Sequence, residues 1–310
     1  MQNLLNEAFP NLTIHSFTRM GNGKSGEIWL ANNEIVFKVT LASDTSNSSL
    51  ALEYDVLHAL NGKVTITIPQ PLYLGTLSDG KMVLGESFVP GVQFSQELYE
   101  TFSQSEKDAL FAHMGDIFHQ IHSADIPKIN NLTAYATGEH HLNDFYTYYT
   151  NDVKNTLTHT EQAQIQKIID DFDKAVKESP PPLVLCHGDL HFWNLNFDPK
   201  TKKICGLLDF GLTCYNDPIN DMRYFWSDTV IQMLQNYPSD IGKYAAERHL
   251  FYCVHNIVEE AHDELAGGKA GFYVDNLKKV IFQNPLPLHV QSSTTLPALP
   301  LLVHTNASSN

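Results

Sequence analysis

The first ninety residues alternate short apolar runs with polar turns, a pattern typical of β-strands. Strands are predicted at residues 13–19, 27–31, 34–40, 64–68 and 81–88. Asn32 and Asn33 separate the second and third of these strands, which favours a tight hairpin turn. Residues 46–60 instead carry leucines at helical spacing and are followed by an Asn-Gly pair, so they predict a helix.

Helical periodicity dominates beyond Pro90-Gly91. Helices are predicted at residues 109–121, 165–176, 221–235 and 244–265, with short buried strands at 183–185 and 204–208. Ser103 and Glu106 fit a capping box before the first of these helices. The chain is therefore predicted to be α+β, with a β-rich N-terminal lobe (residues 1–88), a helical lobe (89–280) and an irregular, uncharged C-terminal segment (281–310).

Composition narrows the functional classes. Apolar residues make up 43% of the chain, which excludes overall disorder. The formal charge of −15 argues against a general nucleic-acid binder, because phosphate contacts need clustered Lys and Arg. We find no stretch of ~18 uncharged apolar residues and no basic N-terminal region. The four cysteines lack CxxC spacing, so we expect a cytoplasmic protein with reduced thiols and no membrane partner.

A glycine-rich segment follows the first predicted strand. Residues 21–26 read GNGKSG and match GxGxxG. A Rossmann site would need a helix next, but residues 27–30 favour a strand, and a Walker A loop would need glycine where Thr18 stands. A glycine loop between two strands is the arrangement that kinases place over ATP phosphates. An ordinary hairpin is the alternative.

Lys38 and Glu53 form a candidate ion pair. Lys38 interrupts a strongly apolar strand, and Glu53 lies within the apolar stripe of the helix at residues 46–60. A carboxylate in such a stripe is costly unless it is paired. Kinases use a pair of this kind to hold a lysine against the α- and β-phosphates. The alternative is that one side chain reaches solvent.

The strongest signal is a pair of short blocks, LCHGDLHFWN at residues 185–194 and LLDFG at 207–211. They supply Asp189 to orient an attacking hydroxyl, and two oxygen ligands for Mg²⁺, Asn194 and Asp209. Two alternatives use the same region. A transition-metal site of Cys186, His187, Asp189 and His191 would not match zinc-type spacing, and a Cys186 nucleophile would need activation although an apolar run precedes it.

These blocks, together with Asp217-Pro218-x-x-Asp221, resemble the aminoglycoside phosphotransferase (APH) family of small-molecule kinases, in the protein-kinase-like superfamily. The order of motifs is similar from about residue 13 to residue 265. The resemblance implies a bilobal kinase-like fold and Mg²⁺-dependent phosphoryl transfer from ATP or GTP. Phe192-Trp193 departs from the family pattern, where a Pro-Gly-like pair is usual, and predicts a bulkier rim for this loop; packing of both rings into the core is the alternative.

The resemblance also implies roles for individual residues. Asp189 would be the catalytic carboxylate, Asn194 and Asp209 would hold magnesium, and Glu53 would position Lys38 at the nucleotide phosphates. Asp221 would support the catalytic loop. The nucleotide would also meet the backbone of the glycine loop and of an interlobe hinge at 84–88; the residues concerned are Gly21, Gly23, Ser25, Gly26, Glu86 and Phe88.

Two related functional classes, protein kinases and pseudokinases, remain as alternatives. A protein kinase would need an arginine in the His187-Gly188-Asp189 motif and an activation loop, but only five residues separate Gly211 from Asp217. A non-catalytic pseudokinase would usually have lost at least one of four motif side chains. All four are present in this sequence: Lys38, Asp189, Asn194 and Asp209.

A small hydroxyl-bearing acceptor is therefore preferred, and a late helix suggests its charge. Glu259, Glu260, Asp263 and Glu264 cluster there, and acidic residues of the helical lobe bind substrate ammonium groups in the family. The acceptor would then be cationic: an aminoglycoside-like antibiotic or another amino alcohol or sugar. The alternative is a solvated helix face.

Overall fold

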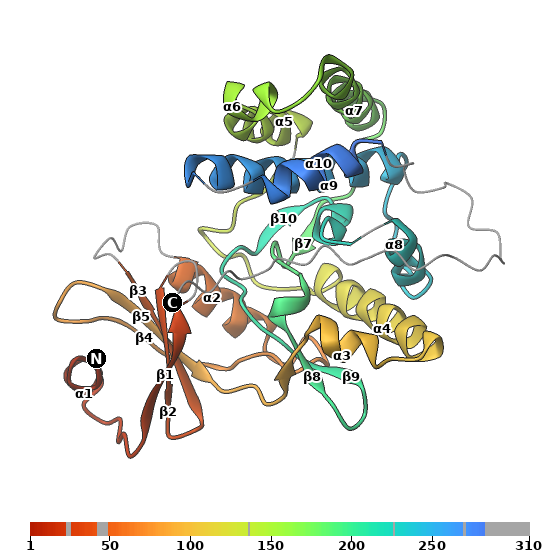
Figure 1. Ribbon diagram of the computed structural model, residues 1–310. Helices are drawn as coiled ribbons and strands as arrows, with labels where there is room; N and C mark the ends of the chain where they lie inside the picture. Colours follow the sequence, from red (N-terminus) through yellow and green to blue (C-terminus); the bar gives the residue numbers. More distant parts are fainter. Residues whose placement is uncertain (23–25, 42–48, 136, 226, 269–270, 283–310) are drawn as a thin grey trace. The chain divides into compact units, whose positions relative to one another are not determined.

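The computed structural model describes residues 1–22, 26–41, 49–135, 137–225, 227–268 and 271–282. The chain forms two compact units (Figure 1). Unit 1 contains Met1–Ser95, Ala124–Thr133 and His187–Thr213, and unit 2 contains the other described residues. The Asp189 and Asp209 motifs therefore belong to the same unit as the N-terminal strands. The predicted lobe boundary near residue 88 stays a prediction.

Unit 1 is built on an antiparallel five-stranded sheet in the order β1-β2-β3-β5-β4. Its strands are β1 (Phe17–Asn22), β2 (Gly26–Ala31), β3 (Ile35–Thr40), β4 (Pro71–Thr76) and β5 (Met82–Ser87). The predicted turn is confirmed, because Asn32 and Asn33 take φ values of 56° and 57° between β2 and β3.

One predicted strand was wrong, and one strand of this sheet was not predicted. Residues 64–68 are not a strand: Ile66 and Ile68 are buried alternately, but within this segment only Thr67 forms a bridge, to Gly206. The strand β4 was missed because its first residue is Pro71, a position that strands tolerate at an edge or start.

Two helices cover opposite faces of the sheet. Helix α1 (Gln2–Ala8) contributes Leu5 to a core with Phe37 and Val39. Successive strand side chains point to opposite faces, so Lys38 points away from this core. Helix α2 (Ser49–Leu60) contacts β4 and β5, and its buried side includes Glu53. The alternation along β3 therefore turns Lys38 toward the helix that carries Glu53.

A second, three-stranded sheet of unit 1 has the order β6-β8-β9. Its elements are β6 (Val92–Gln93), β8 (Leu195–Asp198) and β9 (Lys203–Leu207), preceded by the short helix η1 (Phe192–Asn194). Phe192 stacks on Phe94 with ring centroids 4.3 Å apart. This aromatic contact gives Phe192, the departure from the family pattern, a packing role beside β6.

Unit 2 is mainly helical. Its helices are α3 (Gln96–Glu100), α4 (Gln104–His122), α5 (Gly138–Tyr148), α6 (Asn151–Asn155), α7 (His159–Glu178), η2 (Pro218–Met222), α8 (Ser227–Leu234), α9 (Ala245–Ala266) and α10 (Phe272–Val280), and its strands are β7 (Val184–Cys186) and β10 (Cys214–Asn216). The capping box of Ser103 and Glu106 is confirmed.

The predicted helix at residues 221–235 is replaced by η2 and α8, and α10 was not predicted. Residues 283–310, most of the predicted C-terminal segment, lie outside the described residues.

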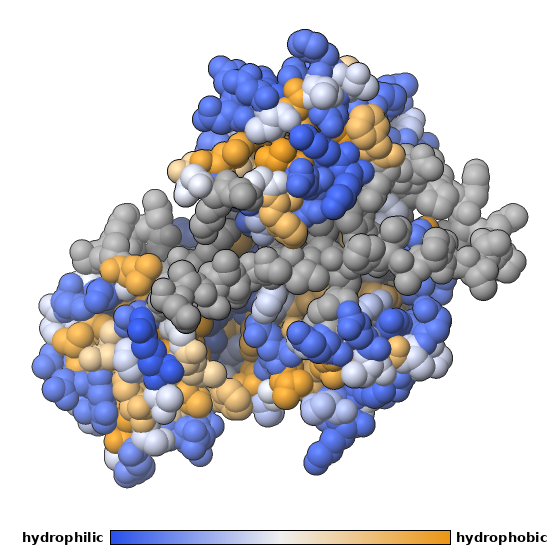
Figure 2. Space-filling view, in the orientation of Figure 1, coloured by the Kyte–Doolittle hydropathy of each residue, from blue (hydrophilic) through white to orange (hydrophobic). Residues whose placement is uncertain are grey.

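No described helix is long and apolar enough to cross a membrane. Figure 2 shows hydrophobic and hydrophilic side chains intermingled on the visible face of both units. The exposed large hydrophobic residues belong to several elements, among them Leu72 on β4 and Phe272 on α10.

A buried ion pair fixes η2 against α9 within unit 2. Arg248 is 0% exposed, and its Nε donates to Asp217 Oδ2 at 2.6 Å. The Tyr252 hydroxyl and the Ile219 N–H donate to the same carboxylate. Arg248 also donates to the backbone carbonyls of Lys243 and Ile241. The charges are thus paired and hydrogen-bonded on both sides, which a buried pair requires.

Arg248→Met is expected to lower the free energy of unfolding by about 3–5 kcal/mol, because the Asp217 charge would stay buried without its partner. Urea unfolding of the wild type and the variant measures this difference in the free energy of unfolding. The matched control is Lys177→Met, which removes an exposed pair with Asp173 and should change stability by less than about 0.5 kcal/mol. A loss below about 1 kcal/mol for Arg248→Met would contradict the assigned role.

Candidate active site

The predicted Lys38–Glu53 pair is confirmed. Lys38 Nζ lies 2.7 Å from Glu53 Oε1, and the Glu53 side chain is 1% exposed. Burial alone would lower the pKa of Lys38, but Glu53 and two further carboxylates, Glu86 and Asp209, raise it well above its usual range. The ammonium therefore stays charged throughout the working pH range of proteins.

Glu53 also connects α2 to the LLDFG block. Its Oε1 accepts the backbone N–H of Phe210 at 3.0 Å. Phe210 follows Asp209, whose φ of 66° lies in the left-handed region that few non-glycine residues adopt. One carboxylate oxygen thus holds both Lys38 and the turn that presents Asp209. Strained backbone of this kind persists where surrounding contacts over-determine it.

A second carboxylate reaches Lys38, and the sequence analysis missed it. Glu86 lies on β5, was expected to act through its backbone, and its Oε1 is 3.2 Å from Lys38 Nζ. The register pairs Val36 with Glu86 and Lys38 with Leu84, so Lys38, Leu84 and Glu86 share one face of the sheet. Burial raises the pKa of Glu86 to about 8, against the opposing effect of Lys38.

The HGD motif is held by its own histidine. His187 is buried; its Nδ1 accepts the Asp189 N–H at 3.2 Å, and its Nε2 lies 3.0 Å from the Leu208 carbonyl oxygen. An accepting Nδ1 places the proton on Nε2, so the ring bridges the two motif loops as a neutral imidazole. Gly188 has φ 85°, and a Cβ there would lie 2.0 Å from the Leu212 carbonyl oxygen. Only glycine fits this position.

The Asp189 carboxylate is oriented by two neighbours. Asn194 Nδ2 donates to the Asp189 carbonyl oxygen at 2.8 Å and to Asp189 Oδ2 at 3.1 Å. His191 Nε2 lies 3.4 Å from the same Oδ2, while its Nδ1 accepts the Trp193 N–H. The carboxylate is about one-fifth exposed, so it can meet a ligand.

Asn194 and Asp209 are brought together by the hairpin β8–β9. Leu195 pairs with Leu207, and one residue beyond, the Leu208 N–H donates to the Asn194 carbonyl at 2.9 Å. Because Asn194 turns its Nδ2 to Asp189, its amide oxygen faces away from that carboxylate. An amide oxygen and a carboxylate at adjacent positions are a donor set that Mg²⁺ accepts. The residues present therefore fit a magnesium ion.

The predicted phosphate loop and hinge are described only in part. Gly23 and Ser25 lie outside the described residues, while Gly21 and Gly26 lie on the paired strands β1 and β2. A Cβ on Gly26 would lie 2.0 Å from the Val39 carbonyl oxygen, so close strand pairing already requires this glycine. In the hinge segment, the Phe88 N–H donates to the Glu34 carbonyl at 2.7 Å and is committed to the sheet.

The two alternative chemistries at Cys186 find no support. Burial raises the pKa of the Cys186 thiol well above its usual range, which suits an inert thiol. Both nitrogens of His187 are engaged by protein groups, as described above. In unit 2, His122, Cys186 and Asp221 do lie together. His122 Nε2 meets Asp221 at 3.0 Å and its Nδ1 meets the Tyr237 hydroxyl at 2.9 Å, so this cluster is a packed hydrogen-bond network.

The acidic residues of α9 divide between two neighbours. Tyr148 of α5 has its pKa raised by burial and then by the charges of Glu259, Asp144 and Asp263. Glu264 instead accepts the Phe272 and Tyr273 N–H groups at the start of α10. Glu260, with Glu264, raises the pKa of Tyr273 after burial. Helical geometry accounts for this division, because residues one apart differ by about 100° around the axis.

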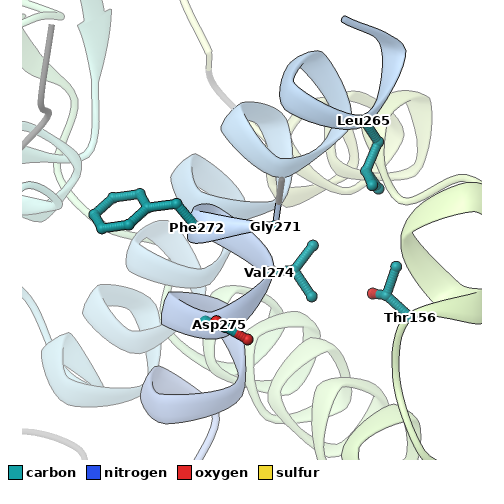
Figure 3. A pocket seen from close by; sticks show the side chains of 6 residues that line it. All are labelled: Thr156, Leu265, Gly271, Phe272, Val274 and Asp275. Carbon is teal, nitrogen blue, oxygen red and sulfur yellow. The ribbon is translucent and has the colours of Figure 1, made fainter. Parts of the chain in front are cut away.

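Two cavities of unit 2 lie beside these helices. One, of about 510 Å³, is lined by Thr156, Leu265, Gly271, Phe272, Val274 and Asp275. Figure 3 shows Val274 and Thr156 facing one another across it, while the Phe272 ring points away. The other, of about 690 Å³, lies between α5 and α7 and carries Glu139, Asp170 and Asp173. Neither is lined by Glu259, Glu260 or Asp263.

These features define a class. A five-stranded antiparallel sheet with a lysine–glutamate pair, a helical unit, and HGD and DFG loops joined by a hairpin make the chain an α+β protein of the bilobal kinase-like fold. Its residues 18–247 match the phosphotransferase enzyme family, APH, and the chain belongs to that family.

Solved structures show the same fold. The GDP complex of wild-type aminoglycoside 2'-phosphotransferase-IIIa is similar with a TM-score of 0.73 at 18% identity, covering 90% of this chain and 95% of that one. The streptomycin–ATP complex of APH(2'')-IIa gives a TM-score of 0.66 at 20% identity, over 91% and 95% of the two chains.

The curated relatives are longer proteins that carry the name acyl-CoA dehydrogenase family member. Acyl-CoA dehydrogenase family member 11 of Homo sapiens is 25% identical over 214 residues, 65% of this chain and 26% of the relative. Acyl-CoA dehydrogenase family member 10 of Mus musculus is 23% identical over 208 residues, 64% of this chain and 18% of the relative. The chain thus spans about a quarter or less of the length of these relatives.

The raised pKa of Glu86 predicts a pH-dependent stability. Between about pH 4.5, the ordinary value, and pH 8 the folded state binds more protons than the unfolded state, so this group's contribution falls as pH rises, by at most about 1.4 kcal/mol per unit. Glu86→Gln removes the titration. The difference in unfolding free energy, variant minus wild type, should increase from pH 5 to pH 8 and then level off.

Urea unfolding at several pH values measures this difference. Glu27→Gln is the matched control, since Glu27 lies in the same sheet and contacts Arg19 and Trp29. A Glu86→Gln difference that stays constant between pH 5 and pH 8 would show that Glu86 titrates normally.

Proposed function

We propose that the chain catalyses Mg²⁺-dependent transfer of a nucleotide γ-phosphate to a hydroxyl group of a small, cationic acceptor. The supporting observation is the connection through Glu53. Glu53 accepts hydrogen bonds from Lys38 and from the Phe210 N–H. The β8–β9 hairpin starts just after Asn194 and ends just before Asp209, so it joins the Asp189 loop to the Asp209 turn. Groups suited to phosphates, metal and hydroxyl thus lie in one unit.

The charges around Lys38 favour a metal-bound nucleotide. One ammonium faces the carboxyl groups of Glu53 and Glu86, with Asp209 also acting on it. A bare polyphosphate would meet the negative field of Glu53 and Asp209, to which Glu86 adds its charge only near and above pH 8, with a single cation to attract it. Magnesium held by Asn194 and Asp209 would neutralise phosphate charge when bound. Lys38 would take a phosphate oxygen directly.

Asp189 would serve the acceptor. Its Oδ2 is held by Asn194 Nδ2 and faces His191 Nε2, which leaves the carboxylate one-fifth exposed and fixed in direction. The acceptor hydroxyl oxygen forms the new bond to the γ-phosphorus as the bond to the bridging oxygen breaks. The hydroxyl proton passes to Asp189, and the nucleoside diphosphate leaves with the bonding electrons.

The donor is a purine nucleoside triphosphate. The similar solved structures include complexes with GDP, with ADP and with ATP, so both purines belong in a screen of this chain. A reducing, cytoplasmic location fits the free state of all four cysteines, Cys186, Cys205, Cys214 and Cys253.

The acceptor is proposed to carry an ammonium group that meets the Glu259 side of α9. The charges of Glu259, Asp144 and Asp263 act on Tyr148 there, and an aromatic ring in the field of carboxylates suits an organic cation. The titles of similar structures name kanamycin, gentamicin and streptomycin. An aminoglycoside is therefore one candidate, and amino alcohols and amino sugars are others.

Asp189→Asn and Asp209→Asn should separate chemistry from binding. Asp189→Asn should reduce transfer by about 100-fold or more while the affinity for Mg·nucleotide stays near wild type. Asp209→Asn should weaken Mg·nucleotide binding itself, and removal of the metal by EDTA should do the same for the wild type. Calorimetry with ATP and GTP, and transfer to a panel of amino alcohols and aminoglycosides, measure both.

Asp198→Asn is the matched control for these two variants, because Asp198 caps the turn of the same hairpin and faces Lys200 and Thr201. Near wild-type transfer by Asp189→Asn would remove that residue from the proposed mechanism.

Glu259→Gln should raise the KM of a cationic acceptor by about three- to tenfold and leave the nucleotide KM unchanged, because one carboxylate partner of the ammonium is lost. Glu260→Gln makes the same neutralisation one residue along, toward Tyr273. Equal effects of both variants would indicate a general acidic field, and an equal effect on nucleotide and acceptor would argue against local acceptor binding.

A further inference from the structure

The Lys38 ammonium has three N–H donors, and the structure shows where two of them go. One meets Glu53 Oε1 at 2.7 Å and another meets Glu86 Oε1 at 3.2 Å. The two carboxylates come from different elements, helix α2 and strand β5. Among the described residues these are the salt-bridge partners of Lys38. A tetrahedral ammonium anchored in two directions has its third N–H direction fixed.

We propose that Glu86 is a positioning residue for Lys38, which aims the remaining N–H of the ammonium at a nucleotide phosphate oxygen. This inference rests on the proposed function. Glu53 alone would leave the ammonium free to rotate about the single contact that holds it. With Glu86 as a second anchor, the ammonium need not be reoriented when the phosphates bind, which reduces the entropy lost at that step.

The two oxygens of Glu86 are not equivalent, and this makes the proposal specific. Oε1 holds Lys38, whereas Oε2 is buried and has no hydrogen-bond partner among the described residues. Only one oxygen is therefore needed for positioning. A glutamine keeps an acceptor oxygen at that place and exchanges the unpartnered oxygen for an amide NH₂, whereas a leucine keeps the bulk and removes the acceptor.

The first test observes the ammonium itself. In protein labelled with ¹⁵N-lysine, the Lys38 ammonium signal is assigned by its loss in Lys38→Arg, and its hydrogen exchange with water is measured. Glu86→Leu should accelerate that exchange by about tenfold or more, because one charge-assisted anchor is lost. Glu86→Gln should stay within about threefold of the wild type. Glu27→Leu and Glu27→Gln are the matched controls from the same sheet.

The second test uses Mg·ATP and Mg·GTP. The stoichiometry of nucleotide binding gives the active fraction, and the rate of phosphoryl transfer is normalised to it. Glu86→Leu should lower kcat by about tenfold and weaken nucleotide affinity less than threefold, because the lysine charge remains and only its orientation is lost. A residue that merely stabilised the fold would change the active fraction and leave the normalised rate and the ammonium exchange at wild-type values.

The outcomes distinguish the two proposals. A wild type that binds neither nucleotide overturns the proposed function. Unchanged exchange of the Lys38 ammonium in Glu86→Leu overturns the role of Glu86 alone, whatever the nucleotide result. If the Lys38 ammonium exchanges equally fast in Glu86→Gln and Glu86→Leu, positioning through an acceptor oxygen is also overturned. Fast exchange in the leucine variant, with rescue by glutamine, supports the proposal.

Discussion

The arrangement of unit 1 depends on the buried carboxylate of Glu53 and its two partners. A charge that is 1% exposed must be compensated nearby, and here an ammonium and a backbone N–H both compensate it. Each partner belongs to a different part of unit 1, the sheet and the turn after β9. Loss of Lys38 would leave the buried Glu53 charge unpaired, and loss of the Phe210 N–H would remove one of its hydrogen-bond donors, so Glu53 favours one arrangement of the sheet, α2 and the Asp209 turn.

The second constraint is the register of β8 and β9. Pairing of Leu195 with Leu207 leaves Asn194 and Leu208 at the open end of the hairpin, bonded to one another. A shift of one residue would turn alternate side chains to the other face and would separate Asn194 from Asp209. His187 adds a second bridge from the Asp189 loop to Leu208. The geometry of the candidate site is therefore a consequence of strand pairing and one neutral imidazole.

Much of this site was predictable because its signals are local. Glu53 interrupts an apolar stripe, and the HGD and DFG motifs each lie within ten residues. Glu86 was not predictable in the same way: its role depends on β3 and β5 pairing in one register, between residues 48 apart (86 − 38), and no local pattern records that pairing.

Other differences from the predicted elements have similar causes. Helix α10 begins where Glu264, eight residues earlier, caps Phe272, and β4 begins at a proline that usually marks a break. The division of the acidic residues of α9 could have been predicted from the sequence, because the 3.6-residue period of a helix separates Glu259 and Asp263 from Glu260 and Glu264. Periodicity predicts which residues share a face, but not which helix packs on that face.

The charge balance around Lys38 links stability to function. A site designed for the stability of the free protein would place one carboxylate beside one ammonium, because a second buried carboxyl lowers stability wherever it ionises. Here Glu86 is present as well, with a pKa raised to about 8 by burial. Such a group is tolerated at a binding site, where ligands and metal alter the local field. Even with Glu86 protonated, the charges of Glu53 and Asp209 oppose that of Lys38, so the candidate site would disfavour a bare anion and suit the metal-bound polyphosphate that we propose as the donor.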